Sequence, residues 1–199
     1  HNPMENLKFA IFGCGFWSQF QLGAWTEVEG AECIALCDRT RSKAEKLAER
    51  FGIAGVYDSA EELLQNEKLD FVDIITDVDT HACLVELAVK NGVPNVICKK
   101  PLAPDYDTAK RMVKICKDAG VNFYIHENYR WEAPIRRYKE IIDSGVIGKP
   151  FKARVSFLSG YPVFDNQPFL AELEQFILTD MGSHVLDISR YLFGECKEL

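Results

Sequence analysis

Leu7-Lys-Phe-Ala-Ile-Phe-Gly-Cys-Gly-Phe-Trp-Ser18 is the stretch of sequence that decides the fold. Residues 7–12 are an apolar run typical of a buried strand, and Gly13-Cys14-Gly15 follows immediately. Residues 16–28 then have the pattern of a helix. In strand–turn–helix units of this kind, the first glycine allows a tight turn and the second lets the backbone approach a pyrophosphate at the helix N-terminus. The stretch therefore predicts the first unit of a nucleotide-binding α/β fold.

The next hundred residues alternate strand patterns with helix patterns. Repeated strand–helix–strand units imply a parallel, doubly wound sheet with right-handed crossovers. We therefore predict an N-terminal Rossmann domain over residues 4–127. Further strands are expected at residues 32–37, 71–75, 96–98 and 122–126. Helices are expected at residues 42–51 and 108–119. Two more helices are expected between them, one that begins at Ser59 and one that ends at Asn91.

The pattern changes after about residue 127. Pro134 suits the first turn of a helix that ends at Ser144. Residues 152–158 alternate like a half-buried strand of a different sheet, and residues 182–193 form a second helix pattern. One strand and two helices leave too little sheet to cover the helices. Residues 128–199 are therefore predicted to be the beginning of a second, incomplete α/β domain.

Composition excludes several classes of function. The net charge of −7 disfavours nucleic acid or an anionic membrane as partner, and no apolar run approaches the roughly 20 residues needed to span a bilayer. The seven cysteines are odd in number and contain no Cys-x-x-Cys, which favours reduced thiols in a cytoplasmic protein over a disulfide framework or a zinc site. No signal peptide is expected, and we expect the natural sequence to begin at Met4, after His1-Asn2-Pro3.

The glycine turn has an acidic residue at the expected distance. Asp38 ends the second strand, 20 residues after Ser18, where an acid accepts hydrogen bonds from an adenosine ribose. A Gly-x-Gly alone also fits a simple tight turn, but the combination with Asp38 favours a dinucleotide. An acid at this position repels a 2′-phosphate, so NAD is the predicted cofactor. Arg39 could hold that phosphate, so NADP stays the alternative.

Thr76 to His81 follow the strand at residues 71–75. Thr76 could hydrogen-bond the cofactor, and Thr80 or Asp79 could cap the helix that follows. The alternative is a capped loop with His81 on a helix surface. The sequence leaves both open.

Cys98-Lys99-Lys100-Pro101 closes a short apolar strand. Ligands of doubly wound folds gather at the carboxyl ends of strands. A lysine held there by a following proline is well placed to hydrogen-bond a substrate hydroxyl and to stabilise negative charge as the hydroxyl becomes a carbonyl. Lys100 is therefore a candidate catalytic residue.

Asp180-Met181-Gly182-Ser183-His184 places an acid and a histidine four residues apart. The two side chains share one face if a helix begins near residue 180. A carboxylate beside a histidine fixes its tautomer and suits it to act as a general base near neutral pH. An N-cap aspartate with a surface histidine, and a metal site with two ligands, are the alternatives.

His126-Glu127-Asn128-Tyr129-Arg130-Trp131 ends the last strand of the predicted nucleotide-binding sheet. So many polar and aromatic side chains at the carboxyl end of a strand suggest the wall of a site. A hinge between domains is the alternative, and the two are compatible.

Together these motifs resemble the Gfo/Idh/MocA family of nucleotide-dependent oxidoreductases along essentially the whole chain. Lys99-Lys100-Pro101 is similar to the family's Glu-Lys-Pro signature, and Asp180-x-Gly182-x-His184 to its Asp-x-Gly-x-His signature. Residues 144–150 are similar to its crossing into the second domain. The resemblance implies a Rossmann domain, then an α/β domain with an open, mainly antiparallel sheet, and a full length well beyond this chain.

The resemblance also implies a reaction, the NAD(P)-dependent oxidation of a sugar or polyol hydroxyl by hydride transfer to nicotinamide. Lys100 would bind the reacting hydroxyl, His184 would remove its proton with support from Asp180, and Trp17 would cover the nicotinamide. No metal ion is implied, and the full-length protein is expected to be a homo-oligomer. The implied contacts are Gly13, Gly15, Phe16, Trp17, Asp38, Arg39, Thr76, His81 and Lys100 for the cofactor, and Asn128, Arg154 and Tyr161 for the substrate.

Two residues depart from the family pattern. Lys99 replaces the glutamate of the Glu-Lys-Pro signature, and Asp77 replaces the proline usual after the threonine at the strand end. The Gly15-Phe16-Trp17 turn and Asn166-Gln167-Pro168 are similar to a subgroup that acts on D-apiose, which implies a pentose or similar sugar as substrate. A glycosidase of the same family that uses NAD transiently and a non-catalytic, NAD-binding regulator are the alternative functions.

Overall fold

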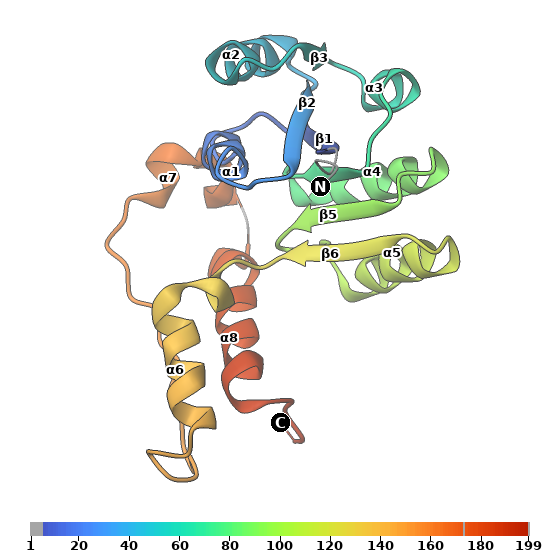
Figure 1. Ribbon diagram of the computed structural model, residues 1–199. Helices are drawn as coiled ribbons and strands as arrows, with labels where there is room; N and C mark the ends of the chain where they lie inside the picture. The colour runs from blue at the N-terminus through green and yellow to red at the C-terminus, as the bar shows by residue number, and fades with distance from the viewer. Residues whose placement is uncertain (1–5, 173, 199) are drawn as a thin grey trace. The chain divides into compact units, whose positions relative to one another are not determined.

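The structure is a computed structural model that describes residues 6–172 and 174–198 (Figure 1). The expected start of the natural sequence at Met4 lies outside the described residues. The chain divides into two compact units, with the boundary between His126 and Glu127.

In the described part of the first unit, six strands form one sheet in the order β3-β2-β1-β4-β5-β6. Every neighbouring pair is parallel. This order, with its switch point between β1 and β4, is that of a doubly wound dinucleotide-binding sheet, so the predicted Rossmann fold is confirmed. The strands are β1 (Leu7–Phe12), β2 (Ala31–Cys37), β3 (Gly55–Tyr57), β4 (Phe71–Ile74), β5 (Asn95–Lys99) and β6 (Asn122–His126).

Alternating side chains of β1 build a core on each face of the sheet, because successive residues of a strand point to opposite faces. Phe9 and Ile11 are fully buried in one core with Leu22 of α1. Ala10 and Phe12 are buried in the other core, together with residues of α4 and α5. The helices of this unit are α1 (Ser18–Trp25), α2 (Arg41–Phe51), α3 (Ala60–Asn66), α4 (Val78–Lys90) and α5 (Tyr106–Asp118).

Capping side chains set where two of these helices begin. The Ser59 Oγ accepts a hydrogen bond from the Glu62 amide at 3.2 Å and so caps α3, which begins where the sequence predicts a helix. Asp105 accepts from the Thr108 amide at 2.8 Å, which starts α5 at Tyr106 rather than at Thr108. Unpaired amides at a helix start are satisfied in this way.

The second unit is helical in its described residues. Its principal helix, α8 (Ser183–Phe193), packs against α6 (Ala133–Asp143) and against the short 3₁₀ helix η1 (Tyr129–Trp131). The Arg130 guanidinium joins η1 to α8 through two hydrogen bonds to Asp187, one of them of 2.8 Å. The remaining segments are α7 (Val163–Asn166), the 3₁₀ helix η2 (Pro168–Glu172) and the π-helix η3 (Ile177–Gly182).

Residues 152–158 do not form the strand that their alternation predicts. They lie in an irregular segment and are mostly exposed, with Leu158 at 93%. A strand needs a neighbour to complete its hydrogen bonds, and within residues 127–172 and 174–198 there is no strand with which this segment could pair. The alternation of apolar and polar residues indicates which side chains would face a core if the segment were a strand, but it does not provide the neighbouring strand.

No helix in the described part of the chain has both the length and the apolar character needed to cross a membrane.

Candidate functional site

The Gly13-Cys14-Gly15 turn has the geometry of a phosphate-binding turn. Gly13 has φ of +102°, and a Cβ there would lie 2.9 Å from the Thr76 backbone nitrogen, so only glycine fits. At Gly15 a Cβ would meet nothing within 4 Å, so this face of the turn is open. The first turn of α1 carries no acidic side chain, which leaves the positive end of the helix dipole available to a phosphate.

Asp38 is fixed in place by two backbone amides. Its Oδ2 accepts from the Cys14 amide at 2.8 Å, and its Oδ1 accepts from the Thr40 amide at 2.8 Å. A carboxylate has about four lone-pair sites, so both oxygens retain capacity to accept further hydrogen bonds. Asp38 thus holds the glycine turn in position and is suited to bind the hydroxyls of a ribose.

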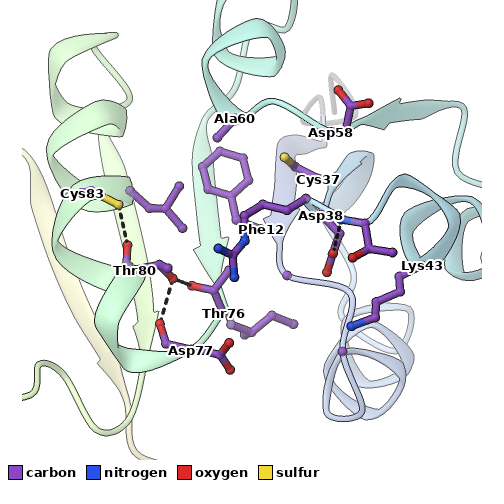
Figure 2. A pocket seen from close by; sticks show the side chains of 16 residues that line it. Phe12, Cys37, Asp38, Lys43, Asp58, Ala60, Thr76, Asp77, Thr80 and Cys83 are labelled. Atoms are coloured by element: carbon purple, nitrogen blue, oxygen red, sulfur yellow. Dashed lines mark hydrogen bonds between the residues drawn. The ribbon is translucent and has the colours of Figure 1, made fainter.

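The turn and Asp38 border a cavity of about 280 Å³ at the carboxyl edge of the sheet (Figure 2). Figure 2 shows Asp38 and Lys43 on one side of the cavity, and Thr76 with Thr80 on the other. Five of the predicted cofactor residues meet here, and a glycine turn beside a fixed acid fits one part of a dinucleotide. The lining residues are Phe12, Gly13, Gly15, Cys37, Asp38, Arg39, Thr40, Lys43, Asp58, Ala60, Ile75, Thr76, Asp77, Thr80, Cys83 and Leu84.

The start of α4 and the hydrogen bonds of the loop before it differ from the sequence prediction. Asp77 is the N-cap residue and has no side-chain capping bond, and both Thr80 and Asp79 lie inside the first turn of α4. The Thr80 Oγ1 donates to the Asp77 carbonyl at 2.8 Å and lies 2.7 Å from the Thr76 Oγ1. The prediction that Thr80 or Asp79 caps the helix is therefore wrong, because the helix begins earlier. Thr80 instead holds the Thr76 side chain in place through the hydrogen bond between their hydroxyl groups.

His81 is buried in the fold, with 1% of its surface exposed. Its Nε2 lies 3.0 Å from the Thr76 carbonyl oxygen and its Nδ1 lies 3.2 Å from that of Leu102. The interpretation of His81 as a surface residue is therefore wrong. The ring joins the loop after β4 to the loop after β5, and it does not line the cavity. Burial lowers the pKa of His81, and the charge of Lys99 lowers it further.

Lys99 and Lys100 lie where β5 reaches the carboxyl edge of the sheet. Lys99 is the last residue of β5, opposite His126 on β6. Lys100 follows, half-buried, and its peptide bond to Pro101 is cis. Lys100 and the residues of the cavity therefore belong to the same edge of one sheet.

Two predicted cofactor residues stay on the surface of the first unit. Phe16 is 37% exposed and Trp17 is 38% exposed. Both rings contact Phe20, with centroids 5.4 Å and 5.6 Å away. They follow the glycine turn directly, so an aromatic surface adjoins the proposed phosphate site.

In the second unit, His184 is held by two residues that sequence reasoning did not assign to it. Its side chain is 5% exposed, and its Nδ1 hydrogen-bonds the Oε1 of Glu127, whose side chain is 11% exposed. The Tyr129 ring stacks on the imidazole with centroids 3.7 Å apart and planes at 8°. The sequence indicates for both residues only that they belong to the wall of a site. Because 57 positions separate Glu127 from His184, no local spacing could reveal the pair.

Asp180 and His184 lie on consecutive helical segments. Asp180 belongs to η3 and His184 to the first turn of α8, whose N-cap is Gly182. The alternative of an N-cap aspartate with a surface histidine is therefore wrong. Burial raises the pKa of Tyr129, and the negative charges of Glu132, Asp180 and Glu127 add to that shift. Asp180 is thus within electrostatic range of the ring that covers His184.

The predicted substrate residues lie in the second unit. Asn128 directly precedes η1, Arg154 is exposed in the irregular segment, and Tyr161 is 58% exposed. Their contact with a substrate stays a prediction. Within residues 6–172 and 174–198, no group of three or more His, Cys, Asp or Glu side chains is arranged to hold a metal ion.

The fold and the glycine turn are those of dinucleotide-binding Rossmann domains, a class that includes a family of oxidoreductases. Residues 7–127 match the model of that oxidoreductase family, and residues 135–199 match the Gfo/Idh/MocA C-terminal domain. The chain belongs to the Gfo/Idh/MocA family. The family resemblance predicted from the motifs is confirmed, as is an NAD-binding Rossmann domain.

Known relatives cover nearly the whole chain. A D-apiose dehydrogenase of Rhizobium rhizogenes is 44% identical over 98% of this chain and 56% of its own length. A myo-inositol 2-dehydrogenase of Thermotoga maritima is 25% identical over 95% of this chain and 55% of its own length. The crystal structure of an oxidoreductase from Agrobacterium radiobacter, in complex with NAD⁺, L-tartaric acid and magnesium, is 45% identical, with a TM-score of 0.93 over 96% of this chain and 55% of that one. The chain spans about half the length of these relatives.

Proposed function

We propose that this protein oxidises a hydroxyl group of a sugar or polyol by transferring a hydride to NAD. The observation that carries the proposal is the carboxylate of Asp38, fixed by two backbone amides beside an open glycine turn. An acid in this position accepts the ribose hydroxyls of NAD and repels the 2′-phosphate of NADP. Arg39 and Lys43 line the same cavity and are the groups that could moderate this preference.

The names of the relatives indicate a class of substrate. D-apiose and myo-inositol, on which two of them act by name, both carry several neighbouring hydroxyls. The higher identity to the D-apiose enzyme favours a pentose or a similar sugar. We therefore propose a polyhydroxylated substrate that is oxidised at one CH–OH group.

The proposed chemistry divides between the cofactor and side chains of this chain. Bound nicotinamide supplies the hydride acceptor. Lys100 donates a hydrogen bond to the reacting hydroxyl and stabilises the negative charge that develops on its oxygen. His184 takes the hydroxyl proton as general base, and Asp180 supports the transfer. The carbinol carbon thereby loses a hydride and the oxygen a proton, which leaves a carbonyl.

Other residues have proposed roles in binding. Trp17, with Phe16, is proposed to cover the nicotinamide, since both rings are exposed beside the glycine turn. Asn128, Arg154 and Tyr161 are proposed to contact the substrate. His81 is proposed to act through the two loops that it joins, rather than by contact with the cofactor.

The full-length protein is proposed to be a homo-oligomer in the cytoplasm. The location is supported by seven free cysteines, of which Cys14, Cys33 and Cys37 have a pKa raised to about 12 by burial, as for unreactive thiols. We also propose that residues 152–158 form a strand of an open, mainly antiparallel sheet when the sheet partners are present. Their alternating pattern supports this.

The test is NADH formation by the full-length protein on a panel of pentoses, hexoses and cyclitols that includes D-apiose and myo-inositol. We expect reduction of NAD, with a clear preference over NADP. Release of a sugar without net NADH would instead support the glycosidase alternative. NAD binding without turnover on any member of the panel would support a regulator.

A further inference from the structure

We propose that Glu127 is the positioning residue that fixes the tautomer and the orientation of His184. The inference rests on the proposed function, in which His184 is the general base. It concerns a residue outside the Lys, Asp and His of the two signature motifs. Glu127 is the first residue of the second unit and reaches His184 across 57 positions of sequence.

The first step is the contact itself. The Oε1 of Glu127 meets the Nδ1 of His184, and the two side chains are 11% and 5% exposed. A hydrogen bond to a charged group in such a buried place is worth more than one in water, since little solvent competes for either partner. The Glu127 carboxylate therefore hydrogen-bonds His184 and is largely shielded from solvent.

The second step is the tautomer. A neutral imidazole has one N–H donor and one acceptor nitrogen, and an ionised carboxylate can only accept. The hydrogen on Nδ1 must therefore point to Glu127, which makes Nε2 the acceptor nitrogen of the ring. A general base needs such a lone pair, and the negative charge of Glu127 stabilises the imidazolium that forms when the base takes a proton.

The third step is the orientation of the ring. Tyr129 stacks on the imidazole at 3.7 Å with planes nearly parallel, which opposes rotation of the ring. Arg130, the next residue along η1, is held by Asp187 of α8. The segment that carries Glu127 and Tyr129 is thus tied to the helix that carries His184.

Several parts of the second unit place charged groups near the imidazole or the Tyr129 ring that covers it. The segment before η1 contributes Glu127, and η3 contributes Asp180. The Arg130–Asp187 pair joins η1 to α8 and is internally neutral. Glu132, which follows η1, acts on Tyr129 without a hydrogen bond to His184. Glu132 therefore provides a control with the same loss of charge.

The first test uses this chain and needs no substrate. Nitrogen-15 NMR of the imidazole distinguishes a protonated Nδ1 from a protonated Nε2, and the His184 signals are assigned by their loss in His184→Gln. We expect the Nδ1–H form in the wild type and in Glu132→Gln, and a mixture of tautomers in Glu127→Gln. A wild-type ring protonated on Nε2 alone would overturn the proposal whatever the enzyme's activity.

The second test uses the full-length protein with a substrate found on the sugar panel. We expect Glu127→Gln to lower kcat by about tenfold to a hundredfold, with KM nearly unchanged, as for other residues that orient a catalytic histidine. The acidic limb of the pH profile of kcat should move to lower pH, because the imidazolium loses its counter-charge. Glu132→Gln should keep the wild-type profile.

A purely structural role for Glu127 predicts a different outcome. Glu127→Gln would then lower thermal stability and the fraction of active protein, but the pH profile of the remaining activity would not move. That result would overturn the proposal. If wild-type protein turns over no sugar, the proposed function fails, while the NMR result still decides whether Glu127 fixes the tautomer.

Discussion

Asp38 joins the structure of the glycine turn to its proposed binding role. Its two oxygens accept from the Cys14 and Thr40 amides, so the same carboxylate orients the turn and faces the cavity. An asparagine cannot accept at both positions, because one oxygen becomes an NH₂ group that faces a backbone N–H. A buried polar group left without a partner costs about 1–3 kcal/mol.

We therefore expect Asp38→Asn to weaken NAD binding by about tenfold or more, which is the equilibrium equivalent of about 1.4 kcal/mol. Isothermal titration calorimetry on the chain measures it. The control is Asp58→Asn, which removes the same charge from a residue of the same cavity whose partner is Arg41 at 3.8 Å. Equal losses in the two variants would mean that charge alone matters and not the bonds to the amides.

His81 predicts a particular dependence of stability on pH. Burial holds its pKa below the usual value of 6.5, so in the window just below 6.5 the unfolded chain binds a proton that the folded chain does not. The contribution of His81 to stability is thus fully present above 6.5 and is lost as the pH falls through its folded pKa. We expect the free energy of unfolding to decline from about pH 7 toward about pH 5, and the decline to be smaller in His81→Gln.

Urea unfolding at several pH values measures this slope, with His126→Gln as the control for removal of a histidine from the same unit. At neutral pH, His81→Gln should itself cost about 1–3 kcal/mol, since it disturbs a buried ring that lies between the Thr76 and Leu102 carbonyls and, when neutral, donates a hydrogen bond to one of them. An unchanged slope in His81→Gln would show that other groups cause the acid sensitivity.

Lys99 gains a role from its effect on His81. Its positive charge lowers the pKa of His81, the ring that joins the loop after β4 to the loop after β5. We expect Lys99→Glu, which restores the family signature, to keep kcat within about threefold, because a single charge that is not fully buried changes interaction energies by about 1 kcal/mol or less. The same variant should raise the pKa of His81 and so reduce the loss of stability at acidic pH. A large change in kcat or in substrate preference would show instead that Lys99 takes part in catalysis.

At the scale of elements, a buried aspartate anchors α1 to the sheet. Asp73 of β4 is fully buried, and its Oδ2 accepts from the Gln21 Nε2 and the Trp25 Nε1, both at 2.7 Å. Trp25 also packs on Phe9 and Phe71. This anchor holds α1 against the sheet, and α1 is the helix at whose N-terminus the phosphates are proposed to bind.

Burial raises the pKa of Asp73, so the folded chain keeps a proton that the unfolded chain has lost above 3.8. Asp73 therefore lowers stability progressively as the pH rises from 3.8 through its folded pKa. Asp73→Asn, whose amide oxygen can still accept both hydrogen bonds and which cannot ionise, should lose this pH dependence. Asp73→Leu leaves two donors unsatisfied and should cost about 2–5 kcal/mol, with weaker NAD binding. Chemical denaturation and calorimetry measure both effects, and an Asp73→Leu variant of wild-type stability would show that the anchor is unimportant.

The elements also show what the sequence can predict. The tight glycine turn and the helix that begins after Ser59 are predicted correctly, because local chemistry determines both of them. The short β3 was missed, since three half-buried residues have no periodicity to read. The strand expected over residues 152–158 does not form, because a strand depends on partners elsewhere in the sheet. The sequence leaves open whether His81 lies on a helix surface, because its two carbonyl partners come from loops that only the fold brings together.

At the scale of the whole molecule, each unit contributes one part of the proposed chemistry. The first unit provides the nucleotide cavity and Lys100, and the second provides His184 with Glu127 and Tyr129. Variants in the first unit at Asp38 or Asp73 should therefore change mainly NAD affinity. Variants of Glu127 should change mainly the pH profile of turnover.

The most direct test of the proposed oxidation is the rate of NADH formation by full-length Lys100→Ala compared with wild type, on a sugar identified from the panel. We expect kcat to fall by about a hundredfold to ten-thousandfold, as when a group that stabilises charge in the transition state is removed. Full activity of Lys100→Ala on that sugar would contradict the assignment of Lys100 as the residue that binds the reacting hydroxyl.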